Sequence, residues 1–233
     1  MNNCAEILNK FAKLNESSNY LEIGVMAGAT FFDVGIKNKH AVDPKFLFEY
    51  KPLETESIKY FEMYSDNFFC SDKPMGSYDL IFLDGLHTFE QTLKDFLNCL
   101  PLLNENSIII IDDVIPSDIY SSNPDQFECY DFRRTFLNSN NTDWHGDIYK
   151  LPIFIHNYLP SYRVKIISDQ DNFRAVVWRE KITGDNIDKS NSLTLDKIYN
   201  LDYLGMLRFL SKSSIMISLN EMLNHLASLN MTK

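Results

Sequence analysis

The sequence predicts an α/β protein: a Rossmann-like, doubly wound, seven-stranded sheet with a terminal antiparallel hairpin, plus C-terminal helices. Three observations lead to this prediction. Short apolar runs alternate with segments of helical periodicity, a glycine turn follows the first central run, and two later runs end in carboxylates. Strands of a parallel sheet read as continuous apolar runs because helices cover both faces, and ligands bind beyond the carboxyl ends of those strands.

The composition is that of an ordinary globular protein. The chain has 233 residues, of which 45% are hydrophobic and 23% charged, with a formal net charge of −10. A nucleic-acid partner would require clustered Lys and Arg to neutralise phosphates, so the acidic balance argues against one. The four cysteines have no metal-ligand spacing, and no segment resembles a signal peptide or a membrane span. We therefore expect a soluble, cytoplasmic protein with no membrane partner.

The first elements are an N-terminal helix and the central strand. Residues 5–14 carry apolar side chains at helical spacing, which predicts a helix covering the domain edge. The central strand and its turn lie in YLEIGVMAGAT, residues 20–30, and a helix is expected over residues 30–36. Gly24 and Gly28 allow a tight turn and a close approach of the backbone to a ligand.

The spacing of the glycines in this turn indicates which kind of ligand the turn could bind. Glu-x-Gly-x-x-x-Gly differs from the dinucleotide fingerprint Gly-x-Gly-x-x-Gly, and Glu22 would repel a pyrophosphate. A ligand with an ammonium and a sulfonium group fits an acidic turn better. The pattern resembles motif I of class I S-adenosylmethionine (SAM) methyltransferases. The alternative is a tight strand–helix turn that binds no ligand.

The second and third strands are expected over residues 40–43 and 58–63. Asp43 ends the second strand about 20 residues after the first glycine, where an acidic residue accepts the ribose hydroxyls of a nucleoside cofactor. Its alternative role is to form a turn. Ser65 and Asp66 begin a short helical segment on the adenine side, where they would accept hydrogen bonds from the adenine amino group or cap the helix.

The remaining elements follow in order. The fourth and fifth strands are expected over residues 78–83 and 108–111, and the four isoleucines of the fifth strand must be buried on both faces. Helices are expected over residues 89–103, 125–136 and 144–158, and a β-hairpin over residues 162–168 and 172–178. Residues 183–192 read as a linker, and residues 196–210 and 214–229 as two amphipathic helices.

Three carboxylates follow the fourth and fifth strands: Asp84, Asp112 and Asp113. Carboxylates gathered at one sheet edge repel each other unless a cation joins them, and oxygen-only ligands suit Mg²⁺. His87 follows Asp84 by three residues, and a histidine accepts protons near neutral pH. The alternatives are a strand-end cap for Asp84, a solvated turn for Asp112 and Asp113, and a helix-start residue for His87.

Longer segments resemble one enzyme family. The segments DGLHTFE (residues 84–90), KDF (94–96) and IDD (111–113) are similar to the class I methyltransferases that include the macrolide-sugar O-methyltransferases and cephalosporin-hydroxylase-like proteins. SDNFF (65–69) and WHGDIYK (144–150) resemble segments of bacterial members. The resemblance covers residues 20–178 and implies a seven-stranded sheet, SAM as the methyl donor and often Mg²⁺. Catechol O-methyltransferases are similar in layout but carry Asp-Asn in place of Asp112-Asp113 and a lysine base in place of His87.

The resemblance and the motifs together predict a SAM-dependent and Mg²⁺-dependent O-methyltransferase. Its acceptor would be a hydroxyl of a small molecule, such as a sugar or nucleotide-sugar. The expected cofactor-binding residues are Glu22, Gly24, Gly28, Asp43, Ser65, Asp66 and Asp84. The expected metal ligands are Asp84, Asp112 and Asp113. His87 would act as the base, with Asp84 also part of the catalytic centre.

Three other readings remain open: a metal-independent N- or O-methyltransferase, an NAD-dependent oxidoreductase, and a non-catalytic SAM-binding protein. For the domains, residues 1–182 are expected to form the methyltransferase domain, with residues 1–19 as its helical cover. Residues 183–233 are expected to form a helical extension that serves as a lid or as the surface of a homodimer.

Overall fold

The computed structural model describes residues 3–74, 76–180 and 193–230. The chain forms two compact units. The first consists of residues 1–86, 94–111 and 220–233, and the second of residues 87–93 and 112–219.

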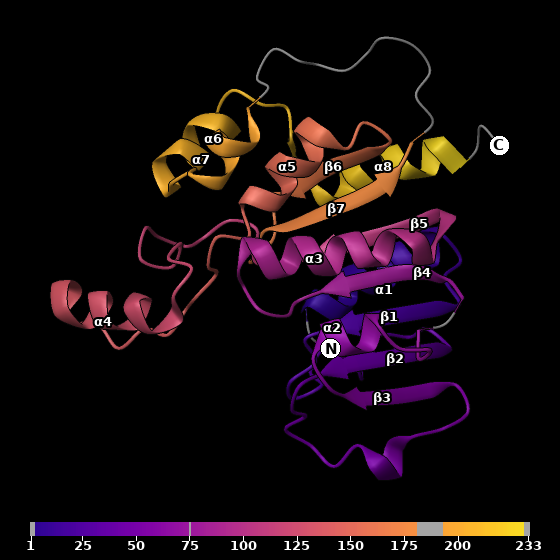
Figure 1. Ribbon diagram of the computed structural model, residues 1–233. Coiled ribbons are helices and arrows are strands. Elements are labelled where there is room, and N and C mark those ends of the chain that lie inside the picture. Colours follow the sequence, from indigo (N-terminus) through magenta and orange to yellow (C-terminus); the bar gives the residue numbers. More distant parts are fainter. Residues whose placement is uncertain (1–2, 75, 181–192, 231–233) are drawn as a thin grey trace. The chain divides into compact units, whose positions relative to one another are not determined.

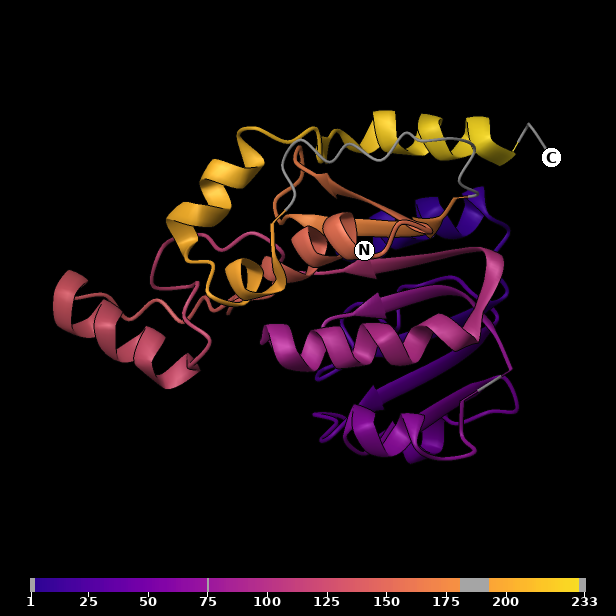
Figure 2. The same ribbon diagram turned by 45° about the horizontal axis from the view of Figure 1, so that its top comes forward.

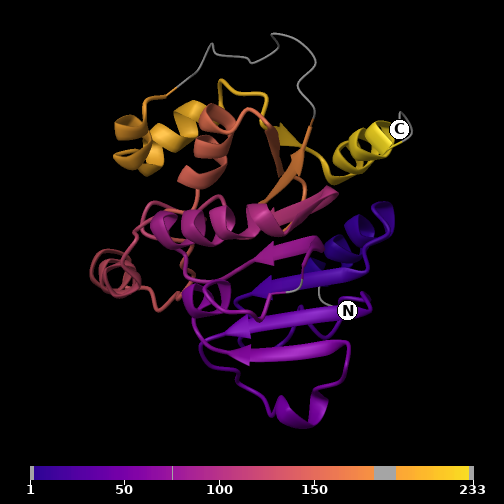
Figure 3. The same cartoon turned by 45° about the vertical axis from the view of Figure 1, so that its right-hand side comes forward.

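The first unit contains five parallel strands in the order β3-β2-β1-β4-β5, which lie side by side in Figures 1 and 3. These strands are β1 (Asn19–Ile23), β2 (Asn38–Asp43), β3 (Ile58–Glu62), β4 (Tyr78–Leu83) and β5 (Leu103–Ile111). The chain runs outward from β1 to β3 and then returns to the other side of β1. This reversal is the switch point at which doubly wound sheets bind ligands.

The core of this unit lies along the central strands. Leu21 of β1 pairs with Ile81 of β4, which in turn pairs with Ile109 of β5, and all three side chains are buried. The predicted burial of the four-isoleucine run is confirmed. Helix α1 (Asn3–Leu14) buries its apolar stripe, as its spacing predicts. Also in this unit are α2 (Ser65–Phe69), most of α8 (Leu219–Asn230) and the second half of α3 (Phe89–Cys99).

The second unit contains three strands in the order β7-β6-β8. The predicted hairpin is confirmed: β6 (Tyr162–Ile167) and β7 (Arg174–Arg179) are antiparallel, and the short strand β8 (Met216–Ile217) runs parallel to β6. The helices of this unit are α4 (Gln126–Leu137), α5 (Lys150–Tyr158), α6 (Leu195–Tyr199) and α7 (Tyr203–Leu210). Helix α5 packs against β6 of the hairpin, and the hairpin is drawn in orange in Figure 2. The described residues thus hold eight strands, one more than predicted, within the predicted α/β class.

The helix predicted over residues 30–36 is wrong. This segment consists of turns, with hydrogen bonds such as that from the Val34 amide to the Thr30 carbonyl (3.2 Å). The segment consists mostly of aromatic and β-branched residues and also contains Gly35, and all of these residue types are weak helix formers. The ring of Phe31 is fully buried beside Tyr20 and Tyr60, so tertiary packing outweighs the weak helical tendency.

Helix boundaries also differ from the prediction. The helix expected over residues 89–103 ends at Cys99, and Leu103 already belongs to β5. The helix expected to begin at Trp144 begins at Lys150, because Gly146 has a φ of +58°, outside the helical region. Residues 196–210 form two helices, because the Asp202 side chain accepts the Gly205 amide and starts α7 afresh. Residues 214–229 begin with β8 before α8 starts. The predicted linker, residues 183–192, lies outside the described residues.

Within the described ranges, every helix is too short or too polar to cross a membrane.

Candidate active site

The glycine turn after β1 depends on two residues with left-handed backbone conformations. Gly24 and Gly28 have φ angles of +87° and +77°. A Cβ atom at Gly24 would lie 1.9 Å from the carbonyl oxygen of Asp84, and one at Gly28 would lie 2.4 Å from the ring of Phe32. Only glycine therefore fits at position 24, where the turn passes the end of β4, because a Cβ there would overlap the backbone of Asp84.

Asp43 holds this turn in place. Its Oδ2 accepts the amides of Val25 (2.9 Å) and Met26 (2.8 Å), and its Oδ1 accepts the amide of Lys45 (2.7 Å). The Gly24 amide donates to the backbone, so successive N–H groups of the turn are already engaged. Such a turn lacks the row of free amides that cradles a pyrophosphate. Oδ1 accepts one of these hydrogen bonds and has a second acceptor position.

Glu22 belongs to a buried polar group. Its side chain is 1% exposed, and its Oε2 accepts the hydroxyl of Tyr20 at 2.6 Å. Burial raises the pKa of Tyr20 well above its ordinary value, and the negative charge of Glu22 adds to this effect. Burial lowers the pKa of Lys39, whereas the charge of Glu22 opposes that shift. Glu22 thus contributes a negative charge in the interior next to the turn.

An exposed apolar side chain follows each of the strands β1 to β4. These side chains are Met26 (61% exposed), Leu47 (60%), Tyr64 (69%) and Leu86 (55%). They follow the carboxyl ends of neighbouring parallel strands, on the side where such sheets bind ligands. Large apolar side chains gathered at a surface mark a binding site more often than scattered ones do.

Ser65 and Asp66 lie in the first turn of α2, as predicted. The N-cap residue of this helix is Tyr64, and no side chain caps it, so the capping alternative is wrong. Asp66 Oδ2 accepts a hydrogen bond from the ammonium of Lys94 at 2.5 Å. Asp84 follows β4, and its amide donates to the carbonyl of Ile23 at 2.8 Å.

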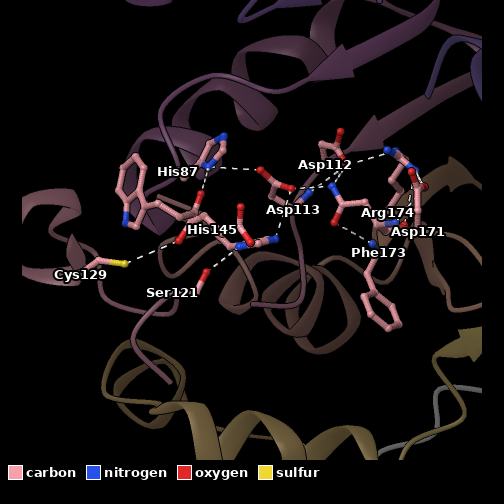
Figure 4. Close-up of polar contacts among 12 residues, drawn as sticks. His87, Asp112, Asp113, Ser121, Cys129, His145, Asp171, Phe173 and Arg174 are labelled. Atoms are coloured by element: carbon pink, nitrogen blue, oxygen red, sulfur yellow. Dashed lines mark hydrogen bonds and ion pairs between the residues drawn. The ribbon is translucent and has the colours of Figure 1, made fainter. Parts of the chain in front are cut away.

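The second unit places a carboxylate between two imidazoles (Figure 4). His87 Nδ1 lies 3.3 Å from Asp113 Oδ2, and His145 Nε2 lies 3.6 Å from Asp113 Oδ1. His87 Nδ1 also lies 2.8 Å from the carbonyl oxygen of Trp144. Because Nδ1 faces two acceptors, it carries the proton, and a neutral His87 has its lone pair on Nε2. This is the tautomer that a general base needs.

His145 is a site residue that the sequence analysis missed. Burial lowers its pKa, although the charge of Asp113 partly opposes this shift, so the neutral form is favoured. Its Nδ1 lies 2.6 Å from the hydroxyl oxygen of the fully buried Ser121. The available signal was the segment WHGD, which had been assigned to a helix. An imidazole at a left-handed turn has a different orientation from one on a helix.

Asp112 has a cationic partner within the protein. Its Oδ1 lies 3.1 Å from Arg174 Nε and accepts the side-chain amide of Asn172 at 2.8 Å. The same amide nitrogen lies 2.5 Å from Asp113 Oδ1 (Figure 4). A metal ion was the expected cation for these carboxylates, and a partner role for Arg174 was not expected from the sequence. The residues that follow the hairpin turn therefore neutralise and orient this pair.

The segment WHGD positions His87 in three ways. The Trp144 ring stacks on the His87 ring with centroids 5.3 Å apart. A Cβ at Gly146 would lie 1.6 Å from the His87 carbonyl oxygen, so the two chain segments touch through a glycine. Asp147 Oδ1 accepts the Phe89 amide at 2.6 Å, two residues after His87.

A family model matches part of the chain. Residues 21–114 match a family model described as a methyltransferase domain. This segment contains β1 to β5 together with Asp84, His87, Asp112 and Asp113. A search of curated proteins found no match.

Solved structures share the fold at low sequence identity. The SAM-bound O-methyltransferase TomG from Streptomyces achromogenes is 11% identical, with a TM-score of 0.50 over 76% of this chain and 79% of that one. The S-adenosylhomocysteine (SAH)-bound methyltransferase PaMTH1 of Podospora anserina is 15% identical, with a TM-score of 0.51 over 76% and 78%. Residues 21–114 thus match a methyltransferase-domain model, and the fold of the chain is that of solved methyltransferases.

Proposed function

We propose that this protein transfers the methyl group of SAM to a hydroxyl group of a small molecule, with His87 as the base. The observation that carries this proposal is the surroundings of His87. Its Nδ1 faces the Trp144 carbonyl and the Asp113 carboxylate, which leaves the lone pair on Nε2. A hydroxyl is a weak nucleophile until its proton is removed, and a positioned histidine can remove it near neutral pH.

The first unit fits the cofactor. Gly24 and Gly28 would let the turn approach the methionine portion of SAM, with the charge of Glu22 favouring a cationic ligand. Asp43 Oδ1 would accept a ribose hydroxyl at its second acceptor position. Ser65 and Asp66 would lie on the adenine side, and the exposed apolar side chains after β1 to β4 would cover the rings. Because the amides of the turn already donate to Asp43, this unit suits SAM better than NAD.

Mg²⁺ is proposed as a second ligand of the site. Asp113 would offer a carboxylate oxygen to the ion, next to His87, which keeps its Nε2 lone pair for the proton. Asp84 precedes His87 by three residues, which limits the distance between their Cα atoms to about 11 Å. Asp112 would have only Oδ2 to offer, since its Oδ1 faces Arg174 and Asn172. A bound Mg²⁺ would make the acceptor hydroxyl more acidic.

For the acceptor, we propose a sugar or a glycan precursor. We also propose that residues 1–182 carry the chemistry and that residues 183–233 complete the site or form a homodimer surface.

Thermal unfolding with SAM, SAH and NAD tests the proposal. A ligand that binds only the folded state at about 100 times its Kd stabilises the protein by about 2.7 kcal/mol. We expect SAM and SAH to raise the melting temperature and NAD to leave it unchanged. Stabilisation by NAD alone would select the oxidoreductase reading.

Methyl transfer with EDTA and with added Mg²⁺ tests the metal. We expect chelation to abolish turnover and Mg²⁺ to restore it, and we expect Asp113→Asn to lose this response. Full activity in EDTA would select the metal-independent methyltransferase, and SAH binding without turnover on any acceptor would select the non-catalytic reading.

A further inference from the structure

The second unit contains a cavity of about 280 Å³. Its wall combines Ser122, Asp147 and Lys150 with Asp202, Tyr203 and Leu204 of the C-terminal segment. We propose that this cavity binds the methyl acceptor, and that the acceptor is a small hydroxyl-bearing molecule without a phosphate group. The inference rests on the proposed function and narrows its substrate class.

The charges around the cavity exclude an anionic ligand. Lys150 is the cationic side chain of the wall, and its ammonium already lies 2.8 Å from Asp147 Oδ2. Asp202 adds a second carboxylate, so the lining carries more negative than positive charge. A phosphate needs unpaired cations or free amides, whereas carboxylates accept hydrogen bonds from hydroxyl or ammonium groups. The lining therefore selects a neutral or amino-bearing molecule over a sugar phosphate or a nucleotide-sugar.

The size of the cavity also favours a small ligand over a nucleotide-sugar. Its volume of about 280 Å³ is close to the lower limit of about 300 Å³ for ligand pockets. A molecule of one ring fits such a space, and Tyr203 is part of its lining.

The wall of the cavity is continuous in sequence with the histidine centre. Ser122 follows Ser121, whose hydroxyl contacts His145. Asp147 follows His145 by two residues, and its other oxygen binds the Phe89 amide after His87. The chain segments that hold the two imidazoles thus also form the cavity.

The C-terminal segment is firmly attached where it forms the wall. The Tyr149 hydroxyl donates to the Leu201 carbonyl at 2.8 Å, and the Tyr199 hydroxyl lies 2.9 Å from Glu90 Oε1. Burial raises the pKa of Tyr149, so its hydroxyl stays protonated and keeps this bond. Residues 201–204 therefore belong to the acceptor site itself.

A pair of matched variants on α7 tests the proposal. Leu204 lines the cavity and is 49% exposed, whereas Leu207 on the same helix is 40% exposed and is not part of the lining. Leu204→Trp should fill the cavity, and Leu207→Trp is the control for adding an indole to α7. The probes are methyl glucoside, glucosamine and glucose 1-phosphate. Their binding to the wild type and to both variants is measured through amide chemical shifts.

We expect methyl glucoside or glucosamine to shift the amides of Tyr203 and Leu204, and glucose 1-phosphate to leave them unchanged. Leu204→Trp should weaken this binding on the order of tenfold, equivalent to about 1.4 kcal/mol, and Leu207→Trp should not. Stronger binding of the phosphate, equal effects of both variants, or no response to any neutral or amino sugar would overturn the proposal.

A thermal shift with SAH in the same samples distinguishes a failure of the cavity proposal from a failure of the proposed function. If SAH stabilises the wild type and Leu204→Trp equally while the sugar shifts are absent, the cavity proposal fails and the methyltransferase stands. If SAH stabilises neither protein, the proposed function itself fails.

Discussion

At the scale of single residues, the surroundings of His87 Nδ1 decide the chemistry of this side chain. Asp113 and the Trp144 carbonyl both face Nδ1, so the side chain is fixed in one tautomer. Asp113 itself is fixed by the Asn172 amide and faces His145 on its other side. The carboxylate orients both rings, as an acidic partner does for a catalytic histidine.

His87→Gln should reduce methyl transfer by a factor of about 10² to 10⁴, the usual contribution of a general base. The glutamine keeps a polar side chain but cannot accept the proton. Turnover is followed as SAH release, and SAH binding is measured in parallel. We expect binding to be unchanged, because His87 lies outside the glycine turn. Turnover within threefold of the wild type would remove His87 from the catalytic role.

Gly24→Ala should destabilise the protein by more than about 1 kcal/mol, the scale for alanine at a positive φ. The added Cβ would also overlap the Asp84 carbonyl, 1.9 Å away. Gly76→Ala is the matched control, since a Cβ there would meet nothing within 4 Å. Urea unfolding measures both variants. Equal stability of the two would contradict the close approach of the turn to β4.

At the scale of elements, side chains cap the start of three helices of the second unit: α4, α6 and α7. Asp125 accepts the amides of Phe127 and Glu128 at the start of α4. Within α4, the side chains that become buried are Cys129 and Arg133. The guanidinium of Arg133 binds Asp118 and the Asp143 carbonyl, which holds α4 to the loops on either side.

Asp125→Ala should lower the stability of α4 by about 1 kcal/mol, because two amides of its first turn lose their acceptor. Amide hydrogen exchange over residues 126–137 reports this locally. Asp125→Asn is the control, because asparagine caps helices about as well as aspartate does. If exchange in the alanine variant matched that in the asparagine variant, the cap would have no energetic role.

At the scale of the whole molecule, buried histidines in both units link stability to pH. Burial lowers the pKa of His40 in β2 to about 4, and burial also lowers the pKa of His145. The unfolded chain, with a histidine pKa of about 6.5, binds these protons more readily than the folded protein does. Both histidines therefore contribute stability that is complete above pH 6.5 and lost on acidification.

The free energy of unfolding should fall as the pH is lowered from about 6.5 toward 4, and His40 should account for up to about 3 kcal/mol of that fall. Urea unfolding at a series of pH values measures the slope. His40→Gln should flatten it, because glutamine can retain the contact with the Tyr78 hydroxyl, 2.9 Å from His40 Nδ1, without titrating. An unchanged slope in this variant would assign the pH dependence to other groups.

The sequence by itself determined the strands and the acidic positions that follow them. Continuous apolar runs such as 78–83 and 108–111 have no stable place except a buried strand, so β4 coincides with its prediction and β5 includes it. The hairpin was equally readable, because strand patterns flanked a polar turn. Signals of this kind depend only on residues that lie close together in the sequence.

Only the tertiary structure decided which partners these side chains meet. Arg174 and His145 lie far in sequence from Asp112 and Asp113, and no local pattern links them. The segments 30–36 and 144–149 were expected to be helical, but packing of Phe31 and the contact of Gly146 with His87 gave them other conformations. Long-range packing outweighs local helical preference, which is worth less than about 1 kcal/mol per residue.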